Sequence, residues 1–237
     1  MRRMLHIAHE DGKIQSVPKV RFLKEPPARR GFLELAKFEE LSAMLPSYLR
    51  PLITLLYYCG TRLGEALQIE WTQVDLQRRL IRLEEDQTKN EEPRIVPLPS
   101  VLVMMLEEMK PKTGRVFSDT NLRTEWARAC TAVGLGKIQK MKSGRHKWHR
   151  YNGLIVHDLR RSAVRNLVNA GVPEKVAMRI SGHKTRAVFD RYHIVSAEDV
   201  TNAMRRVETA SIAAKPVISA RLVQKAPRKP RKLLTGL

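Results

Sequence analysis

The chain has 237 residues, 43% of them hydrophobic, and its 44 lysines and arginines against 24 acidic residues give a formal net charge of +20. This length and hydrophobic content suffice for one sizeable core with a small appendage. The sequence has no apolar run of about 18 residues and does not open with a secretory signal, so a soluble intracellular protein is expected.

Residues 1–30 are expected to lie outside the main domain. Apolar residues at helical spacing predict a short helix over 1–8. Pro18, Pro26 and Pro27 follow among basic residues and indicate a linker or an extended arm. The globular body is predicted to begin near Phe32.

Most of the body follows a helical period. Apolar residues spaced for one helix face predict helices over 36–44, 51–59, 61–69, 101–110, 121–133, 158–170, 173–180 and 197–214. The period changes to that of strands at 80–83 and 94–98, and the polar stretch 84–93 predicts a long hairpin connection. Residues 215–237, rich in Lys, Arg and Pro and without acids, are expected to be disordered in isolation. The predicted fold class is therefore α+β, mainly α, with a small antiparallel sheet.

The two cysteines and the histidine pairs do not predict a metal or disulfide site. Cys59 and Cys130 are too few for a disulfide framework and lack metal-ligand spacing, so two reduced, partly buried thiols are expected. The pairs His6/His9 and His146/His149 lack a set of carboxylate or thiolate partners. A glycine-rich loop for ATP phosphates is also missing, so neither a metal nor a cofactor is predicted.

The positive charge is unevenly distributed along the chain. Residues 1–30 hold 8 basic and 3 acidic side chains, and residues 215–237 hold 7 basic and no acidic ones. Within the body, residues 137–165 contain 9 basic residues and a single acid, Asp158. This central cluster is expected to surround an anion site near Arg160, and it favours nucleic acid as the partner.

Arg160 is the residue that points to this anion site. In the helix predicted over 158–170, it projects from the middle of an apolar face made by Leu159, Ala163, Val164, Leu167 and Val168, with His157 at the edge. Polar side chains, among them Arg161, Ser162 and Arg165, gather mostly on the opposite face. A guanidinium is costly to bury unless an anion meets it. Phosphate is the natural candidate because the planar fork of arginine matches its oxygens bidentately.

Tyr192 is the tyrosine whose surroundings favour a nucleophile. It follows His183 by nine residues and lies between Arg191 and His193, where positive charge favours the phenolate. The alternative is a core aromatic that shares a helix face with Val188 and Phe189. Tyr57 and Tyr58 lie in the apolar run 52–59 and are interpreted as core residues.

Five short motifs occur in an informative order: Thr61-Arg62-Leu63-Gly64-Glu65, Lys89 in the hairpin, His157-Asp158-Leu159-Arg160, Gly182-His183, and Tyr192. This set closely resembles the catalytic domain of the tyrosine recombinases, or phage integrases, over roughly Phe32 to Ala210. Each piece alone is a weak signal, whereas the ordered set with its nine-residue final step is specific.

The resemblance implies a role for each matching position. Arg62 and Arg160 would hold the non-bridging oxygens of one scissile DNA phosphate, and Tyr192 would attack the phosphorus to leave a 3′-phosphotyrosyl bond. Lys89 would be the general acid that protonates the departing 5′ oxygen, His157 would assist proton transfer at the tyrosine, and His183 would hydrogen-bond the phosphate. Glu65 is expected to fix Arg62.

The resemblance also implies a domain organisation and partners. Residues 1–30 would be a remnant helix and basic linker from a missing N-terminal core-binding domain, 31–214 the catalytic domain, and 215–237 a basic tail. The expected partner is double-stranded DNA, bound by a homotetramer in the cytoplasm at the nucleoid, with accessory DNA-bending proteins as further partners. Two alternatives to a recombinase stay open: a catalytically silent DNA-binding remnant and a type IB topoisomerase-like enzyme.

Overall fold

The computed structural model describes residues 2–19, 31–84, 93–109, 112–143, 145–193 and 195–213. The chain divides into two units, Met1–Ile194 and Val195–Leu237. The predictions for 20–30, for the hairpin connection including Lys89 and for the tail 215–237 fall outside the described residues.

The helices lie where the periodicity predicts them, within one or two residues at most ends. In chain order they are α1 (Arg2–Glu10), α2 (Leu35–Met44), α3 (Arg50–Cys59), α4 (Leu63–Ala66), α5 (Ser100–Glu108), α6 (Leu122–Ala132), α7 (Leu159–Asn169), α8 (Glu174–Ser181), α9 (Arg186–Asp190) and α10 (Ala197–Ala213). Two 3₁₀ turns, η1 (Trp71–Gln73) and η3 (Val156–Asp158), precede β1 and α7. The short helix α9 was not predicted.

Helix α4 is shorter than the helix predicted over 61–69. Its N-cap is Arg62, whose backbone N–H donates a hydrogen bond to the carboxylate of Glu65 at 3.4 Å. The chain reaches this point through Gly60, which ends α3 in the left-handed conformation, with φ of 64°.

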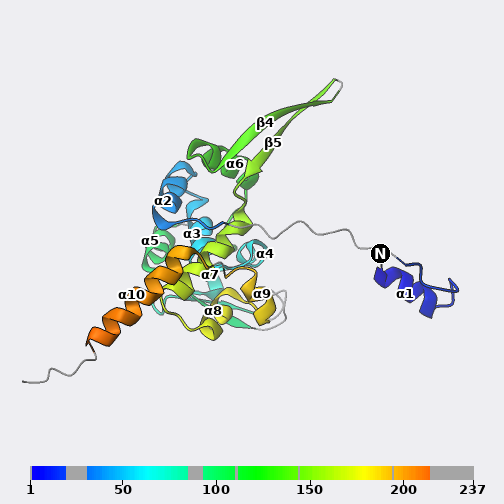
Figure 1. Ribbon diagram of the computed structural model, residues 1–237. Helices are drawn as coiled ribbons and strands as arrows, with labels where there is room; N and C mark the ends of the chain where they lie inside the picture. Colours follow the sequence, from blue (N-terminus) through cyan, green and yellow to red (C-terminus); the bar gives the residue numbers. More distant parts are fainter. Residues whose placement is uncertain are drawn as a thin grey trace, which may run out of the picture. The chain divides into compact units, whose positions relative to one another are not determined.

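The described residues contain five strands, which form two antiparallel sheets. The first is three-stranded in the order β1 (Val74–Asp75), β2 (Leu80–Leu83) and β3 (Arg94–Pro97), with Ile81 opposite Val96. The second is a long hairpin of β4 (Gly136–Ser143) and β5 (His146–Gly153). Figure 1 shows this hairpin extending away from the helices beyond α6. No helix or strand was predicted for these residues.

The core is built mainly on α3, which is buried on almost all sides. Its Tyr57 stacks on Phe38 of α2 with ring centroids 3.8 Å apart, so the prediction that Tyr57 is a core residue is confirmed. Cys59 and Cys130 are both free and buried in the same core. Burial raises their thiol pKa values, to about 12 for Cys59 and about 11 for Cys130, which keeps both thiols protonated and unreactive at neutral pH.

Helix α7 packs against α3, and its polar face is buried as well as its apolar face. The reason is that segment 31–34 covers the polar side: the Leu33 N–H donates to Ser162 at 2.8 Å, and the Arg165 guanidinium lies 3.5 Å from the ring centroid of Phe32. Arg161 pairs with Asp158 at 2.9 Å. These contacts fix the rotation of α7 and so the direction from which Arg160 enters the core.

Two helices, α1 and α10, carry exposed apolar side chains, among them Met4 in α1 and Met204 in α10. No residue of α1 is buried. In the second unit, Val200, Met204 and Val207 follow the helical spacing of one face of α10. Within the described ranges, none of the helices is long and apolar enough to cross a lipid bilayer.

Candidate active site

Arg160 is almost fully buried, with 3% of its surface exposed, and protein groups hold three of its N–H bonds. Its Nη1 donates to the backbone carbonyls of Gly60 and Ser181, and its Nε donates to Nε2 of His183 at 3.1 Å. Its Nη2 is buried and has no hydrogen-bond partner among the described residues. An unpaired buried donor costs about 1–3 kcal/mol, so this group is set up for an acceptor from outside the protein.

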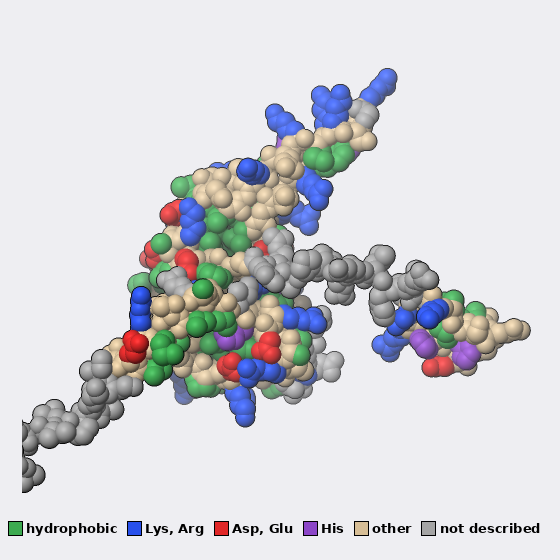
Figure 2. Space-filling model, in the orientation of Figure 1, with side chains coloured by type: hydrophobic (Ala, Val, Ile, Leu, Met, Phe, Trp, Pro, Cys, Tyr) green, Lys and Arg blue, Asp and Glu red, His purple; other side chains and the backbone are tan. Residues whose placement is uncertain are grey.

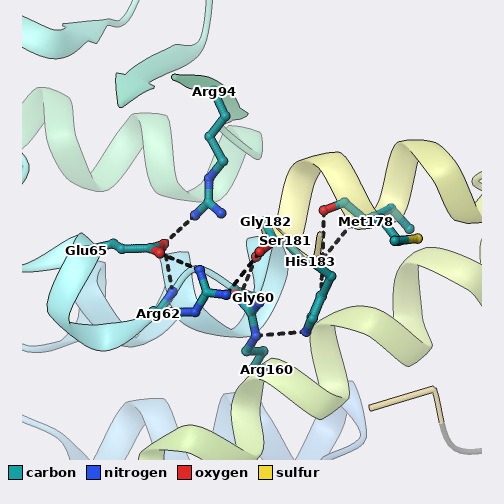
Figure 3. A network of polar contacts seen from close by, with 10 residues as sticks. Gly60, Arg62, Glu65, Arg94, Arg160, Met178, Ser181, Gly182 and His183 are labelled. Atoms are coloured by element: carbon teal, nitrogen blue, oxygen red, sulfur yellow. Dashed lines mark hydrogen bonds and ion pairs between the residues drawn. The ribbon is translucent and has the colours of Figure 1, made fainter. Parts of the chain in front are cut away.

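Arg62 reaches the same place from the start of α4. Its Nη2 donates to the carbonyl of Gly182 at 3.1 Å, one residue after the Ser181 carbonyl that Arg160 contacts. Figure 3 shows the two guanidinium groups meeting at the turn that ends α8. Two arginines that lie 98 positions apart in the sequence therefore converge on consecutive carbonyls.

Glu65 is the carboxylate of this cluster. Its Oε1 accepts from Arg62 at 2.5 Å and its Oε2 from Arg94 at 2.7 Å, while only 4% of its side chain is exposed. Figure 3 shows Glu65 lying between the two guanidiniums. The predicted partnership of Glu65 with Arg62 is present, and Glu65 serves a second arginine as well.

Arg94 is a site residue that the sequence analysis missed. It comes from β3, and 8% of its side chain is exposed. It also explains Gly182, because a Cβ at that position would collide with the Arg94 guanidinium and the backbone there has a φ of +73°. The sequence offered one hint of this role, an arginine at the start of a predicted strand. Its partner Glu65 lies 29 residues away in the sequence, so no local pattern links the two.

The three arginines and one glutamate leave a net positive charge in a poorly hydrated place. Burial, followed by the charges of Arg62 and Arg94, lowers the pKa of Arg160 to about 9. Burial likewise lowers the pKa of Arg94. Because mutual repulsion disfavours the charged forms, an anion that binds here gains the attraction of more than one guanidinium.

His183 is held as a neutral ring with a defined tautomer. Arginine can only donate, so Nε2 of His183, which faces Arg160, must be the acceptor and therefore carries no proton. Nδ1 then carries the proton and donates to Ser181 Oγ at 2.7 Å, and this hydroxyl donates onward to the carbonyl of Ala177 at 2.7 Å. Ser181 is a second residue that sequence reasoning missed. In this arrangement His183 orients Arg160, and its expected hydrogen bond to a phosphate stays a prediction.

The surroundings of His183 keep its ring neutral. Burial, followed by the charges of Arg160 and Arg62, lowers the pKa of His183 to about 3. Only 5% of the residue is exposed. Protonation would place a further charge among the arginines, which is why the neutral form is favoured.

This pKa predicts a pH-dependent stability. As the pH falls below the ordinary histidine value of about 6.5, the unfolded chain takes up a proton at His183 and the folded chain does not, so the free energy of unfolding decreases by up to about 1.4 kcal/mol per pH unit. Urea unfolding between pH 7.5 and pH 5 measures this slope. The variant His183→Gln is expected to have a shallower slope, and a slope equal to that of the parent would contradict the assignment.

Tyr192 and His157 complete the site. The Tyr192 hydroxyl lies 2.8 Å from Nε2 of His157, and the Arg160 guanidinium lies 5.5 Å from the centroid of the phenol ring. The ring of His183 is also adjacent, with a centroid distance of 4.8 Å. Partial burial, followed by the charges of Arg160 and Arg161, lowers the pKa of His157, so its ring is neutral at pH 7 and can accept a proton.

The alternative interpretation of Tyr192 as a core aromatic stays open, because its ring packs against the small core of Val164, Ala177 and Phe189. Phe189 is fully buried there, whereas Tyr192 is half-buried and its hydroxyl lies at His157, outside that core. Five of the six predicted catalytic residues are thus in or beside one cluster. The sixth, Lys89, lies outside the described residues.

The comparisons with known proteins agree with this fold. The model of the phage integrase family matches residues 32–199, which is most of the chain, and the chain therefore belongs to that family. A protein named tyrosine recombinase from Thermosipho africanus (strain TCF52B) is 22% identical over 204 residues, covering 83% of this chain and 69% of the relative.

Solved structures of integrases and recombinases share the architecture. The XerA recombinase superposes with a TM-score of 0.60 at 17% identity, over 77% of this chain and 66% of that one. A lambda integrase dimer bound to a COC′ core site gives a TM-score of 0.61 at 19% identity, over 81% of this chain and 70% of that one. The chain thus spans about two thirds of the length of these relatives, and at such identities the likeness shows the fold.

Proposed function

We propose that this chain is a site-specific DNA recombinase that cuts and rejoins DNA through a 3′-phosphotyrosyl intermediate. The observation that carries the proposal is the juxtaposition of the Tyr192 hydroxyl, 2.8 Å from His157, with the paired guanidiniums of Arg62 and Arg160. A candidate nucleophile, a candidate proton acceptor and two guanidiniums that could hold one phosphate lie close together. Membership of the phage integrase family supports the same reaction class.

The arginine cluster accounts for phosphate binding and for charge stabilisation. Nη2 of Arg160 has no acceptor within the part of the chain that the structure describes, and the Arg62 side chain is about a quarter exposed, so both can donate to the non-bridging oxygens of one phosphodiester. Charge builds on these oxygens in the pentavalent transition state. The guanidinium donors are already held in place by Glu65, Ser181 and His183, so they need not reorganise as this charge develops. Preorganised donors of this kind lower the activation free energy.

The nucleophile needs its proton removed, since an unperturbed phenol has a pKa of about 10. The Tyr192 oxygen attacks phosphorus, its proton passes to Nε2 of His157, and the bond from phosphorus to the 5′ oxygen breaks. We assign protonation of the departing 5′ oxygen to Lys89 on the resemblance in sequence. In the reverse step, a 5′-hydroxyl attacks the phosphotyrosine, and the covalent bond has kept the energy needed for rejoining.

Assembly on DNA belongs to the same proposal. Exchange of strands between two duplexes needs four active sites, so we propose a homotetramer on DNA. The apolar face of α10, formed by Val200, Met204 and Val207, is the proposed contact with a neighbouring copy. Accessory DNA-bending proteins are proposed as further partners, and association with the nucleoid follows from DNA binding.

Trapping on nicked DNA tests the chemistry. A library of random duplexes nicked near the cleavage position lets a short fragment diffuse away after cleavage, so that religation fails and the adduct accumulates. We expect a protein–DNA adduct that survives denaturation, and peptide mass spectrometry should locate the 3′-phosphate on Tyr192. Binding without any adduct would instead support a silent DNA-binding remnant. Relaxation of supercoiled plasmid without recombinant products would support a topoisomerase-like enzyme.

A further inference from the structure

The β4–β5 hairpin carries most of the positive charge that the sequence analysis placed around Arg160. Of the nine basic residues in 137–165, only three lie on α7, and the other six, Lys137, Lys140, Lys142, Arg145, Lys147 and Arg150, belong to the hairpin and its turn. Residues 136–153 contain no acid. The expectation of one cluster around the anion site was therefore wrong: tertiary structure divides the charge between the site and a projecting arm.

This arm is exposed along its length but firmly attached at its base. All six basic side chains are exposed, and none of them forms an ion pair with a described carboxylate. At the base, the hydroxyl of Tyr151 donates to the carbonyl of Leu154 at 2.9 Å, and Nε1 of Trp126 in α6 donates to the same carbonyl at 2.7 Å. Gly136 and Gly153 are paired there, and a Cβ on Gly136 would collide with the Tyr151 ring.

Figure 2 shows the consequence at the surface: blue Lys and Arg side chains surround the hairpin and no red acidic side chain lies on it in this view. Eight residues in each strand give the ribbon a reach of roughly 26 Å at about 3.3 Å per residue. Two exposed faces with no core of their own are unusual for a ribbon of this length, because an isolated hairpin is only marginally stable in water. The arm therefore has the form of a binding element.

The strand register gives the two faces different chemistry. Opposed residues share a face, so Lys140, Lys142, Lys147 and His149 lie together on one side, which we call the lysine face. The other side, called the amide face, presents Gln139 opposite Arg150, Met141 opposite Trp148, and Asn152 opposite Lys137. Its Trp148 is 39% exposed and stacks on His146 with ring centroids 5.5 Å apart.

We propose that the β4–β5 hairpin is a second DNA-binding element, which lies in the major groove of the duplex beside the cleavage site. The lysine face would contact backbone phosphates and the amide face would contact base edges. The inference rests on the proposed function for its partner. The charge of the hairpin favours DNA as the partner over the surface of another protein. Six cations without an acidic residue among them complement the phosphate backbone of DNA.

The dimensions and side chains agree with this groove. The major groove is about 12 Å wide and admits a two-stranded ribbon, whereas the minor groove at about 6 Å does not. Glutamine and asparagine read adenine there, and arginine reads guanine, which are the polar residue types of the amide face. Lysine serves as a flexible point charge for phosphates, and it is the residue that dominates the opposite face.

The experiment removes the lysine face and measures DNA binding by fluorescence anisotropy across a salt series. The probe is a 30-bp random-sequence duplex, and the variant is Lys140→Gln/Lys142→Gln/Lys147→Gln. Three phosphate contacts at about 0.9 each predict that the slope of log affinity against log salt becomes shallower by about 2.7, with affinity at physiological salt reduced roughly tenfold or more. Replacement of the same three lysines by arginine should restore both values.

A matched control carries the same loss of charge elsewhere. Lys37, Arg78 and Arg128 are each ion-paired with a carboxylate on the body of the domain, and their replacement by glutamine is expected to leave the salt slope near that of the parent. A lysine-face variant that binds like this control would overturn the proposal. So would a variant that loses self-association by light scattering while it keeps DNA affinity, because the arm would then bind a second copy.

The amide face has its own readout. The double variant Gln139→Ala/Asn152→Ala changes no charge, so the salt slope should stay the same while preference among sequences in a selected duplex pool falls. An unchanged sequence preference would contradict base contact by this face.

The outcomes separate this inference from the proposed chemistry. Anisotropy measures binding without cleavage. If the lysine-face variant binds DNA weakly but the parent forms no adduct, the proposed chemistry is contradicted and the arm remains a DNA-binding element. If the parent forms the adduct and the lysine-face variant binds normally, only the role of the arm is contradicted, whereas a parent that binds no duplex would contradict both.

Discussion

Replacement of Tyr192 by phenylalanine is expected to abolish the covalent adduct completely while leaving the fold and DNA affinity almost unchanged. Phenylalanine keeps the ring next to His183, at 4.8 Å, and next to the Arg160 guanidinium, at 5.5 Å. It loses only the oxygen that lies 2.8 Å from His157. One hydrogen bond is worth about 1 kcal/mol of stability, so the loss of activity cannot be explained by unfolding.

The adduct is measured on a denaturing gel with the nicked library, and binding is measured by anisotropy on the same duplexes. Tyr48 offers a matched control, because it is 42% exposed and its hydroxyl donates to the carbonyl of Thr120 at 3.0 Å, away from the site. Tyr48→Phe should form the parental amount of adduct. An undiminished adduct in Tyr192→Phe would assign the nucleophile to another residue.

The substitution Glu65→Gln is expected to destabilise the free protein by about 3–5 kcal/mol, the usual cost of breaking a buried ion pair from one side. Glu65 is the carboxylate that both Arg62 and Arg94 contact, and 4% of it is exposed. Glutamine keeps the size of the side chain but leaves the guanidiniums to repel one another. Urea unfolding at pH 7 measures the loss.

Two further variants show whether charge is the cause. Adding Arg94→Met to Glu65→Gln removes one of the uncompensated cations and should recover a large part of the stability, which a double-mutant cycle quantifies. Glu125→Gln, which breaks a pair with the exposed Arg128, should cost at most about 1 kcal/mol. If Glu65→Gln costs no more than Glu125→Gln, the buried cluster does not depend on Glu65. Sulfate in the millimolar range should stabilise Glu65→Gln more than the parent, because the variant has more unpaired positive charge.

These two predictions describe opposite demands on one cluster. The proposed reaction needs guanidiniums that are not fully neutralised, so that a phosphate oxygen can accept their hydrogen bonds and be attracted by their charge. The fold needs enough compensation to keep those guanidiniums inside. Glu65 satisfies part of the charge, while the carbonyls of Gly60, Ser181 and Gly182 satisfy hydrogen bonds without removing charge. Carbonyl acceptors thus orient the arginines and leave their charge available for a ligand.

The sequence by itself determined the local elements and the residue types of the candidate site. Helical periodicity and glycine stops depend on neighbours three or four positions apart, which is why α3, α7, α8 and α10 lie where they were predicted. The ordered motif set predicted the integrase family, and the family match confirms it. Arg160 was identified as a buried cation in need of an anion, and its 3% exposure agrees.

Only the tertiary structure decided which partners those residues have. The Glu65–Arg94 pair joins residues 29 positions apart, and the tautomer of His183 follows from Arg160 on another helix. Neither leaves a periodic signal in the sequence. The charge of 137–165 was also misplaced on sequence alone, because the β4–β5 hairpin is polar on both faces and alternates no apolar side with a polar one. A strand is recognisable in sequence when one of its faces packs on a core, and beyond Tyr151 at its base this hairpin packs on none.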